Sequence, residues 1–193
     1  MMPDKVIIML SGYLKSGKDT VGKFLCEKYG FERLAFADIL KDEVAGLHNL
    51  PRPLLDSQEY KESTCNFTSD AHKTIRQILI DHGQQKRSEN LHYWIDKLIR
   101  HIKIKMSQTF VITDWRFPNE YDVVKEQLTP LGYGVYRWRI QRWKHCILDD
   151  ITENALNNFE FDELVDNTGT KQELYDNVTK LLSKMHFNSN ILL

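Results

Sequence analysis

Two short runs rich in apolar residues, Val6–Leu10 and Thr109–Thr113, are the strongest structural signals along the chain. Neither run alternates with polar residues, so each is typical of a strand buried on both faces of a parallel sheet. Shorter apolar or aromatic segments predict three more strands, at Arg33–Phe36, Gly134–Ile140 and Glu163–Val165. The hydrophobic pattern therefore predicts five strands.

The segments between these strands carry apolar residues at helical spacing. In Lys18–Tyr29 the apolar residues share one face, and Gly30 supplies a C-terminal stop. Pro118 suits the first turn of a helix over residues 118–128. Further helices are predicted at residues 38–47, with Asp38 as N-cap, and at 70–82, 91–106 and 171–184. The alternation predicts an α/β fold: a doubly wound, five-stranded parallel sheet with right-handed crossovers and helices on both faces.

A glycine-rich loop joins the first strand to the first helix. It reads Ser-Gly-Tyr-Leu-Lys-Ser-Gly-Lys-Asp-Thr over residues 11–20, which contains Gly-x4-Gly-Lys in the strand–loop–helix context that this motif requires. Glycines let the backbone wrap an anion, and the successive N–H groups and the helix N-terminus point at it. Lys18 can reach the β and γ phosphates. The loop therefore predicts a polyphosphate site.

The residue after Lys18 departs from the usual pattern. Asp19 stands where the consensus hydroxyl ligates magnesium, and the hydroxyl is displaced to Thr20. Asp19 can hold Mg²⁺ through water, or it can be a helix N-terminal charge favoured by the dipole. The sequence leaves these two interpretations open.

A kinase with a phosphorylated acceptor must bring two anions together, and each pair of unit charges about 5 Å apart costs roughly 3 kcal/mol at an effective dielectric of 20. Cations must offset this repulsion, and the candidates are Arg76, Arg87, Arg116, Arg137, Arg139 and Arg142. Arg116 stands out because it follows a buried strand, at the edge where doubly wound folds bind ligands. Asp114 ends the same strand, where a carboxylate can orient Mg²⁺ or accept a hydrogen bond from the acceptor.

Composition narrows the class of protein. The 193 residues carry 26 Lys and Arg against 27 Asp and Glu, a formal net charge of −1 that a nucleic-acid coat or polybasic membrane protein would not have. Three widely spaced cysteines argue against a disulfide framework and a four-cysteine zinc site. The first apolar run is too short for a signal sequence or a membrane span. We expect a cytoplasmic protein whose partners are small molecules, with no nucleic acid and no membrane among them.

Several of these segments resemble the deoxynucleoside monophosphate kinases of large DNA viruses and phages. The loop ending Gly17-Lys18-Asp19-Thr20 is similar to that family's phosphate loop. Other segments resemble its second motif (Phe36–Lys41), its acceptor region (Ile75–Gly83 with Trp94), its signature Asp-x-Arg-Phe-Pro-Asn-Glu (Asp114–Glu120), its lid (Ile151–Leu156) and its last strand (Val165–Gly169). The resemblance implies that the protein transfers the γ-phosphoryl group of ATP to a deoxynucleoside monophosphate, which gives the diphosphate.

The resemblance also implies an organisation and a set of cofactors. One P-loop kinase domain would have a core at about 1–47, 107–140 and 159–186, a helical acceptor-binding insertion at about 48–106 and a short lid at about 141–158. ATP and Mg²⁺ are the implied cofactors and nucleotides the implied small-molecule substrates, and a homodimer is left open. A viral source would place the protein in the host cytoplasm or a viral factory.

Residue roles follow from the same resemblance. The implied catalytic residues are Lys18, Asp114, Arg116 and Arg142, the last of these in the lid. The implied ATP-binding residues are Gly12, Lys15, Ser16, Gly17, Lys18, Asp19, Thr20 and Asn167, with Asp19 and Thr20 toward Mg²⁺. The implied acceptor-binding residues are Arg76, Gly83, Trp94, Asp114, Arg116 and Glu120.

Two alternatives remain open at this point. Animal-type phosphomevalonate kinases share the Lys-Ser-Gly-Lys-Asp loop, and residues 54–62 and 83–87 also resemble their acceptor region, although their strand end resembles Asp-Thr-Arg-Arg without Phe-Pro-Asn-Glu. The other alternative is a non-catalytic ATP-binding or DNA-associated module. Trp94 and Trp115 can stack on a base, but tryptophans near helices more often belong to the core.

Overall fold

The computed structural model describes residues 5–64, 73–105, 107–142 and 154–185, and its chain divides into two compact units. The first unit comprises residues 1–35 and 99–193, and the second comprises residues 36–98. Most of the expected lid, residues 143–153, lies outside the described residues.

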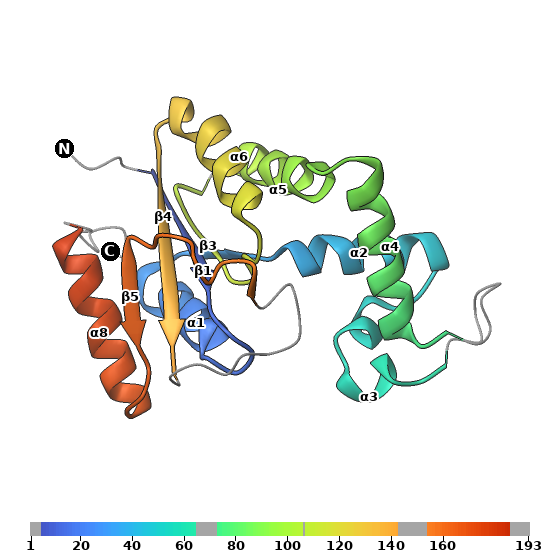
Figure 1. Cartoon of the computed structure of the whole chain (residues 1–193), viewed down its shortest axis with the longest axis horizontal. Helices are drawn as coiled ribbons and strands as arrows, with labels where there is room; N and C mark the ends of the chain where they lie inside the picture. Colours follow the sequence, from blue (N-terminus) through green and yellow to red (C-terminus); the bar gives the residue numbers. More distant parts are fainter. Residues whose placement is uncertain (1–4, 65–72, 106, 143–153, 186–193) are drawn as a thin grey trace. The chain divides into compact units, whose positions relative to one another are not determined.

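The first unit contains a five-stranded sheet (Figure 1). Its strands are β1 (Lys5–Ser11), β2 (Glu32–Leu34), β3 (Thr109–Ile112), β4 (Tyr133–Gln141) and β5 (Glu163–Asp166). They are arranged in the order β2-β3-β1-β4-β5, and every neighbouring pair is parallel. The predicted five-stranded parallel sheet is therefore confirmed.

The helices of the first unit follow from the connections between strands. α1 (Lys18–Tyr29) leads from β1 toward β2, whereas α6 (Pro118–Leu128) and the short η2 (Thr129–Leu131) lead from β3 past β1 to β4. Because these two crossovers run in opposite directions and right-handed crossovers then place their helices on opposite faces of a sheet, α1 and α6 cover opposite faces. α8 (Lys171–Lys184) follows β5 and packs against α1.

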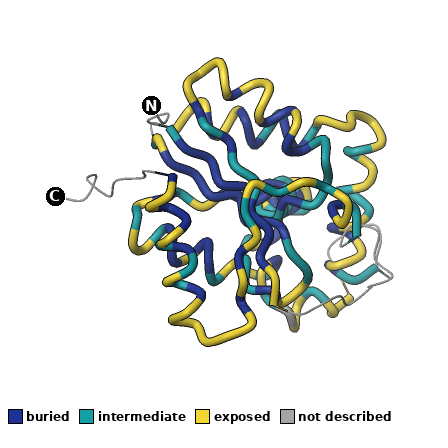
Figure 2. The backbone as a smooth tube through the Cα atoms, turned by 60° about the vertical axis from the view of Figure 1, so that its left-hand side comes forward, coloured by how far each residue is buried: buried dark blue, intermediate teal, exposed yellow. Residues whose placement is uncertain are grey.

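The core of the first unit explains the continuous apolar runs. Val6, Ile8 and Leu10 of β1 pack with apolar residues of α1 and α8, while Ile7 and Met9 alternate to the opposite face, and all five side chains are buried. The central strands β1 and β3 are buried along almost their whole length, and Figure 2 shows buried segments of the chain in dark blue. Burial on both faces therefore accounts for the absence of polar alternation in β1.

The second unit is helical. It contains α2 (Phe36–His48), η1 (Arg52–Leu55), α3 (Gln58–Lys61), α4 (Ile75–Glu89) and the start of α5 (Tyr93–Ile104). Its core is built mainly from buried aliphatic residues of α2 and α4, together with Leu50 and Leu55. None of the described helices is long and apolar enough to cross a membrane.

Two helix boundaries differ from the predictions. α2 begins at Phe36, so Asp38 lies in its first turn and the prediction that it is the N-cap is wrong. α4 begins after Thr74, whose side chain accepts a hydrogen bond from Gln77 N at 3.1 Å, and continues past Gly83 to Glu89. Gly83 therefore lies inside this helix, where it faces the Leu40 side chain of α2.

Candidate functional site

The glycine loop leaves the carboxyl end of β1 and enters α1. Gly12 has φ +148° and Gly17 has φ +105°, conformations that a side chain strongly disfavours. A Cβ on Gly12 would lie 2.5 Å from the Ile140 carbonyl oxygen, and one on Gly17 would overlap the side-chain amide of Asn167. Both glycines are therefore required by the fold of the loop, as the motif predicts.

Lys18 is held across this loop. Its Nζ donates hydrogen bonds to the backbone carbonyls of Gly12 at 2.5 Å and Tyr13 at 2.9 Å. The ammonium group therefore lies against the start of the loop although Lys18 is the first residue of α1. This arrangement places a positive charge beside the N-terminus of a helix, and both features favour an anion.

Two polar side chains surround the middle of the loop. Ser16 is buried, and its hydroxyl has no hydrogen-bond partner among the described residues. Asn167, which the resemblance assigns to ATP, is also buried and donates its side-chain amide to the Ser16 carbonyl at 2.7 Å. The structure thus places Asn167 behind the loop as its support, and its assignment to ATP stays a prediction.

The remaining loop residues have varied exposure. Lys15 is exposed and adopts φ +61°, Asp19 is exposed in the first turn of α1, and Thr20 is half-buried. No group of three or more His, Cys, Asp or Glu side chains in the described part of the chain can hold a metal ion. A Mg²⁺ ion here would therefore depend on phosphate oxygens and water in addition to Asp19 and Thr20, which suits an ion that keeps several waters.

The end of β3 lies at the same edge of the sheet as the loop. β3 pairs with β1 so that Ile112 is level with Met9, and both strands then leave the sheet toward Asp114 and Gly12 respectively. Asp114 and Arg116 are half-buried. The predicted convergence of these two residues with the loop at the carboxyl edge of the sheet agrees with the register.

Glu120, which the resemblance assigns to the acceptor, is buried at the start of α6. It is 2% exposed, and its Oε2 accepts hydrogen bonds from the backbone N–H groups of Arg116 at 2.9 Å and Phe117 at 3.1 Å. Phe117 is the N-cap of α6 and Pro118 its first residue, so Glu120 satisfies the start of that helix. The carboxylate fixes the backbone that carries Arg116, and direct contact with an acceptor stays a prediction.

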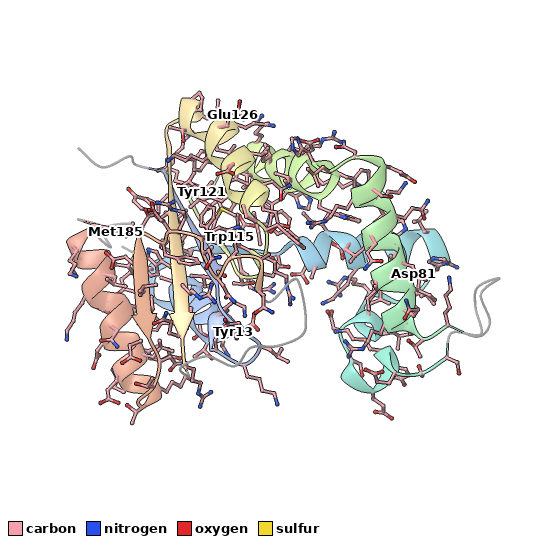
Figure 3. All side chains as sticks on the ribbon, viewed as in Figure 1. Tyr13, Asp81, Trp115, Tyr121, Glu126 and Met185 are labelled. Carbon is pink, nitrogen blue, oxygen red and sulfur yellow. The ribbon has the colours of Figure 1, made fainter. Side chains whose placement is uncertain are left out.

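Trp115 anchors this strand end in an aromatic cluster. Its indole N–H donates to the Phe117 carbonyl at 2.8 Å, and its ring centroid lies 5.3 Å from that of Phe159. The Tyr121 ring centroid lies 5.7 Å away, and Figure 3 labels both Trp115 and Tyr121. The side chain is 1% exposed. The core interpretation of Trp115 therefore holds, and a base has no access to its ring face.

Arg137 and Arg139 of β4 and Arg142, which directly follows the strand, have different environments. Arg137 forms an ion pair with Asp162 at 2.6 Å, which holds the pKa of Arg137 above its usual value. Arg139 is buried and contacts the segment after residue 153, whereas Arg142 is exposed at the end of the strand. In the sequence, Arg139 stands between the apolar Trp138 and Ile140, and this placement is the signal that could have indicated its interior position.

The second unit holds the acceptor residues implied by the resemblance. Trp94 is 6% exposed, and its indole N–H donates to the Gly83 carbonyl at 3.2 Å, so these two residues serve the packing of α4 and α5. Arg76 is exposed and pairs with Glu62 at 2.7 Å. Their roles toward an acceptor stay predictions.

A group of cations lies near Arg76 within the second unit. Lys61 of α3 is half-buried, and burial followed by the charges of Lys41 and Arg76 holds its pKa below its usual value. Lys41 pairs with Asp56 at 2.8 Å and Arg76 with Glu62, but no described carboxylate lies within 4.0 Å of the Lys61 amine. Sequence analysis did not single out Lys61 or Lys41 as cations of a site, because they are separated along the chain.

Comparisons with solved structures support the fold. The chain is similar to dephospho-CoA kinase from Campylobacter jejuni, with TM-score 0.52, 14% identity, and coverage of 93% of this chain and 96% of that one. It is also similar to a sugar kinase from a Janibacter species, with TM-score 0.50, 15% identity, and coverage of 97% of each chain. At these identities the likeness concerns the fold alone, which is that of the P-loop kinases.

Sequence comparison defines the family. No curated protein shows significant sequence similarity to the chain. The profile of the family described as phosphomevalonate kinase matches residues 10–130, which include the loop of residues 12–20, the whole second unit, β3 and α6. Because the match covers more than half of the 193 residues and contains the phosphate loop with its Lys18, the chain belongs to the phosphomevalonate kinase family.

Proposed function

We propose that the protein transfers the γ-phosphoryl group of ATP to the phosphate of a small phosphomonoester. The observation that carries this proposal is the loop itself, in which Gly12 and Gly17 take conformations reserved for glycine and Lys18 lies across the backbone. The buried Ser16 hydroxyl without a partner among the described residues fits a loop that binds an anion. Family membership favours a phosphorylated acceptor.

The chain's own residues divide the work of such a transfer. The amides of the loop and the Lys18 ammonium bind and orient the polyphosphate, and Mg²⁺ when bound offsets charge on the phosphate oxygens. Arg116 supplies a cation, and Asp114 a carboxylate, at the edge of the sheet where the loop begins. An acceptor phosphate needs no strong general base, because its second pKa of about 6 leaves it largely dianionic at neutral pH.

An anionic acceptor is supported by the cations of the second unit. The charges of Lys41 and Arg76 lower the pKa of Lys61, whereas the charge of Asp56 raises it, and no described carboxylate lies within ion-pair distance of the Lys61 amine. An acceptor phosphate would relieve this repulsion by contributing negative charge. We therefore assign the acceptor phosphate to Lys61, Lys41 and Arg76.

Two acceptors have specific support. Phosphomevalonate is favoured by the family match over residues 10–130. A deoxynucleoside monophosphate is favoured by the likeness of Asp114–Glu120 to the viral and phage signature. In the Phe-Pro-Asn-Glu half of that signature, Phe117 is the N-cap of α6 and Glu120 accepts a hydrogen bond from its backbone N–H. Trp94 and Trp115 are buried. We therefore favour phosphomevalonate over a nucleotide as the acceptor.

An acceptor panel tests the proposal. ADP release is measured with Mg·ATP and each of phosphomevalonate, the deoxynucleoside monophosphates and the ribonucleoside monophosphates. Activity with phosphomevalonate alone is expected, and activity restricted to deoxynucleotides selects the second acceptor.

Lys61→Ala should lower kcat/KM for the acceptor by about tenfold or more, because a charge-assisted contact is worth about 1.5–3 kcal/mol. Lys86→Ala, which removes an exposed ion pair with Glu89 in α4, is the matched control. Turnover of no phosphomonoester would contradict the proposal.

A further inference from the structure

Arg139 is a buried cation at the end of β4, level with Ser11, the last residue before the loop. It is 7% exposed. One terminal nitrogen, Nη1, donates to the Leu156 carbonyl at 3.0 Å, and the other, Nη2, donates to Oδ1 of Asn157 at 2.8 Å. A buried guanidinium is costly unless its donors are satisfied, so these contacts fix its orientation.

The face of the same guanidinium contacts the phosphate loop. It lies 5.0 Å from the centroid of the Tyr13 ring, within the range of a cation–π interaction. The Tyr13 hydroxyl in turn donates to Oδ1 of Asn157 at 2.8 Å. A single amide oxygen of Asn157 therefore accepts from both Tyr13 and Arg139, and the three side chains form a closed cluster.

The backbone carbonyl of Tyr13 connects this cluster to the Lys18 side chain. Its carbonyl oxygen accepts hydrogen bonds from Lys18 Nζ at 2.9 Å and from Ser16 N at 3.0 Å. The residue whose side chain is fixed by Arg139 and Asn157 is thus the residue whose backbone holds the lysine. Fixing the Tyr13 ring restricts the carbonyl that sets where the Lys18 ammonium lies.

We propose that Arg139 and Asn157 are positioning residues for phosphoryl transfer, which act through Tyr13 to fix the start of the phosphate loop and the Lys18 amine. The proposal rests on the polyphosphate-binding role of the loop. It extends the site to residues 139 and 157, which lie outside both the loop motif and the family match over residues 10–130. A loop that is already ordered before the polyphosphate arrives loses less conformational entropy when it binds the polyphosphate.

Variants of Asn157 separate positioning from packing, because this side chain is exposed and its replacement leaves the core intact. Asn157→Asp keeps an oxygen acceptor for Arg139 and Tyr13, whereas Asn157→Leu has a similar volume and no acceptor. We expect Asn157→Leu to lower kcat by about tenfold and Asn157→Asp to stay within about twofold of wild type, because small misplacement of a catalytic group is costly. Asn158→Ala, an exposed neighbour, is the matched control and should match wild type.

Tyr13→Phe supplies a second, independent measurement. It removes only the hydroxyl, so a double-mutant cycle with Asn157→Leu reports whether the two side chains act together. We expect the double variant to lose no more than about twofold beyond Asn157→Leu alone, with KM for the acceptor unchanged within about twofold. Arg139→Lys should have a lower kcat than wild type, since an ammonium lacks the planar fork that donates from two nitrogens while its face lies over the Tyr13 ring.

The outcomes are separable from those of the proposed function. Binding of Mg·ADP to the wild-type protein is measured first by calorimetry. The absence of binding would contradict the proposed function itself. If the wild type binds and turns over while Asn157→Leu and Tyr13→Phe match it in kcat, the positioning role is wrong. Equal losses in Asn157→Asp and Asn157→Leu, or fully additive losses in the double variant, would also overturn it.

Discussion

The side-chain amide of Asn167 donates a 2.7 Å hydrogen bond to the backbone carbonyl of Ser16, a residue 151 positions earlier in the chain. Asn167 directly follows β5, and Ser16 lies in the middle of the phosphate loop. The same amide occupies the space that a side chain on Gly17 would need. The residue after the last strand therefore supports the loop conformation in which Gly17 has φ +105°.

Substitution of Gly17 tests this conformation. Gly17→Ala must place a methyl group on the Asn167 amide while keeping φ at +105°, so the loop has to change shape. We expect Mg·ADP affinity to fall by more than about tenfold, which corresponds to about 1.4 kcal/mol. Gly30→Ala is the control, since Gly30 has φ +71° with nothing within 4 Å of its would-be Cβ. It should lower stability by about 1–2 kcal/mol and leave affinity unchanged.

Replacement of Asn167 tests the support directly. Asn167→Asp exchanges the donor that faces the Ser16 carbonyl for a carboxylate oxygen, and two acceptors then face each other in a buried place. We expect a loss of about 1–3 kcal/mol in unfolding free energy, together with weaker Mg·ADP binding. Urea unfolding and calorimetry measure the two quantities. Unchanged values for both would show that the hydrogen bond has no role in the loop.

Glu120 distinguishes a structural role from contact with the acceptor. Glu120→Gln keeps an oxygen that can accept from Arg116 N and Phe117 N, whereas Glu120→Ala removes it. We expect Glu120→Ala to lose about 1–3 kcal/mol of stability and Glu120→Gln clearly less. If Glu120 acts through the start of α6, acceptor KM in Glu120→Gln stays within about twofold of wild type. A large rise in KM in a stable Glu120→Gln protein would instead support direct acceptor binding.

The second unit should lose stability in acid through Glu43. Burial raises the pKa of this carboxyl, but hydrogen bonds from Lys97, His82 and Tyr93 together outweigh it and hold the pKa below its usual 4.5. A carboxyl whose pKa is lower in the folded state adds stability above its unfolded pKa, and that contribution disappears as the pH falls through the folded value. Glu43→Gln should therefore be less stable than wild type at pH 7, with a difference that shrinks below about pH 4.5. Urea unfolding at several pH values checks this, with the exposed Glu59→Gln as control, and a constant difference would contradict it.

Much of the fold was predictable from local patterns. Val6–Leu10 had to be buried on both faces because no polar residue interrupts it, and β1 is the central strand of the sheet. Gly30 ends α1 in a left-handed conformation as expected. The end of α4 was not predictable, because Gly83 resembles a stop and yet the helix continues through it to Glu89.

The site was predictable where one segment carries the signal. The loop motif located Gly12, Gly17 and Lys18, because all three belong to one short run of residues between β1 and α1. Asn167 contacts Ser16, and Asn157 contacts Tyr13, across more than 140 residues of sequence, so the sequence alone cannot assign these two hydrogen bonds.

The most direct measurement is a single-turnover transfer with ATP labelled on its γ phosphate, using wild type and Lys18→Ala. Lys18 carries the charge that lies across the loop, and removal of one such electrostatic contact typically costs about 10²–10³ in rate. We expect that wild type moves the label onto the phosphomonoester acceptor and that Lys18→Ala does so at least about a hundredfold more slowly. Label released only as inorganic phosphate, or equal transfer by both proteins, would contradict it.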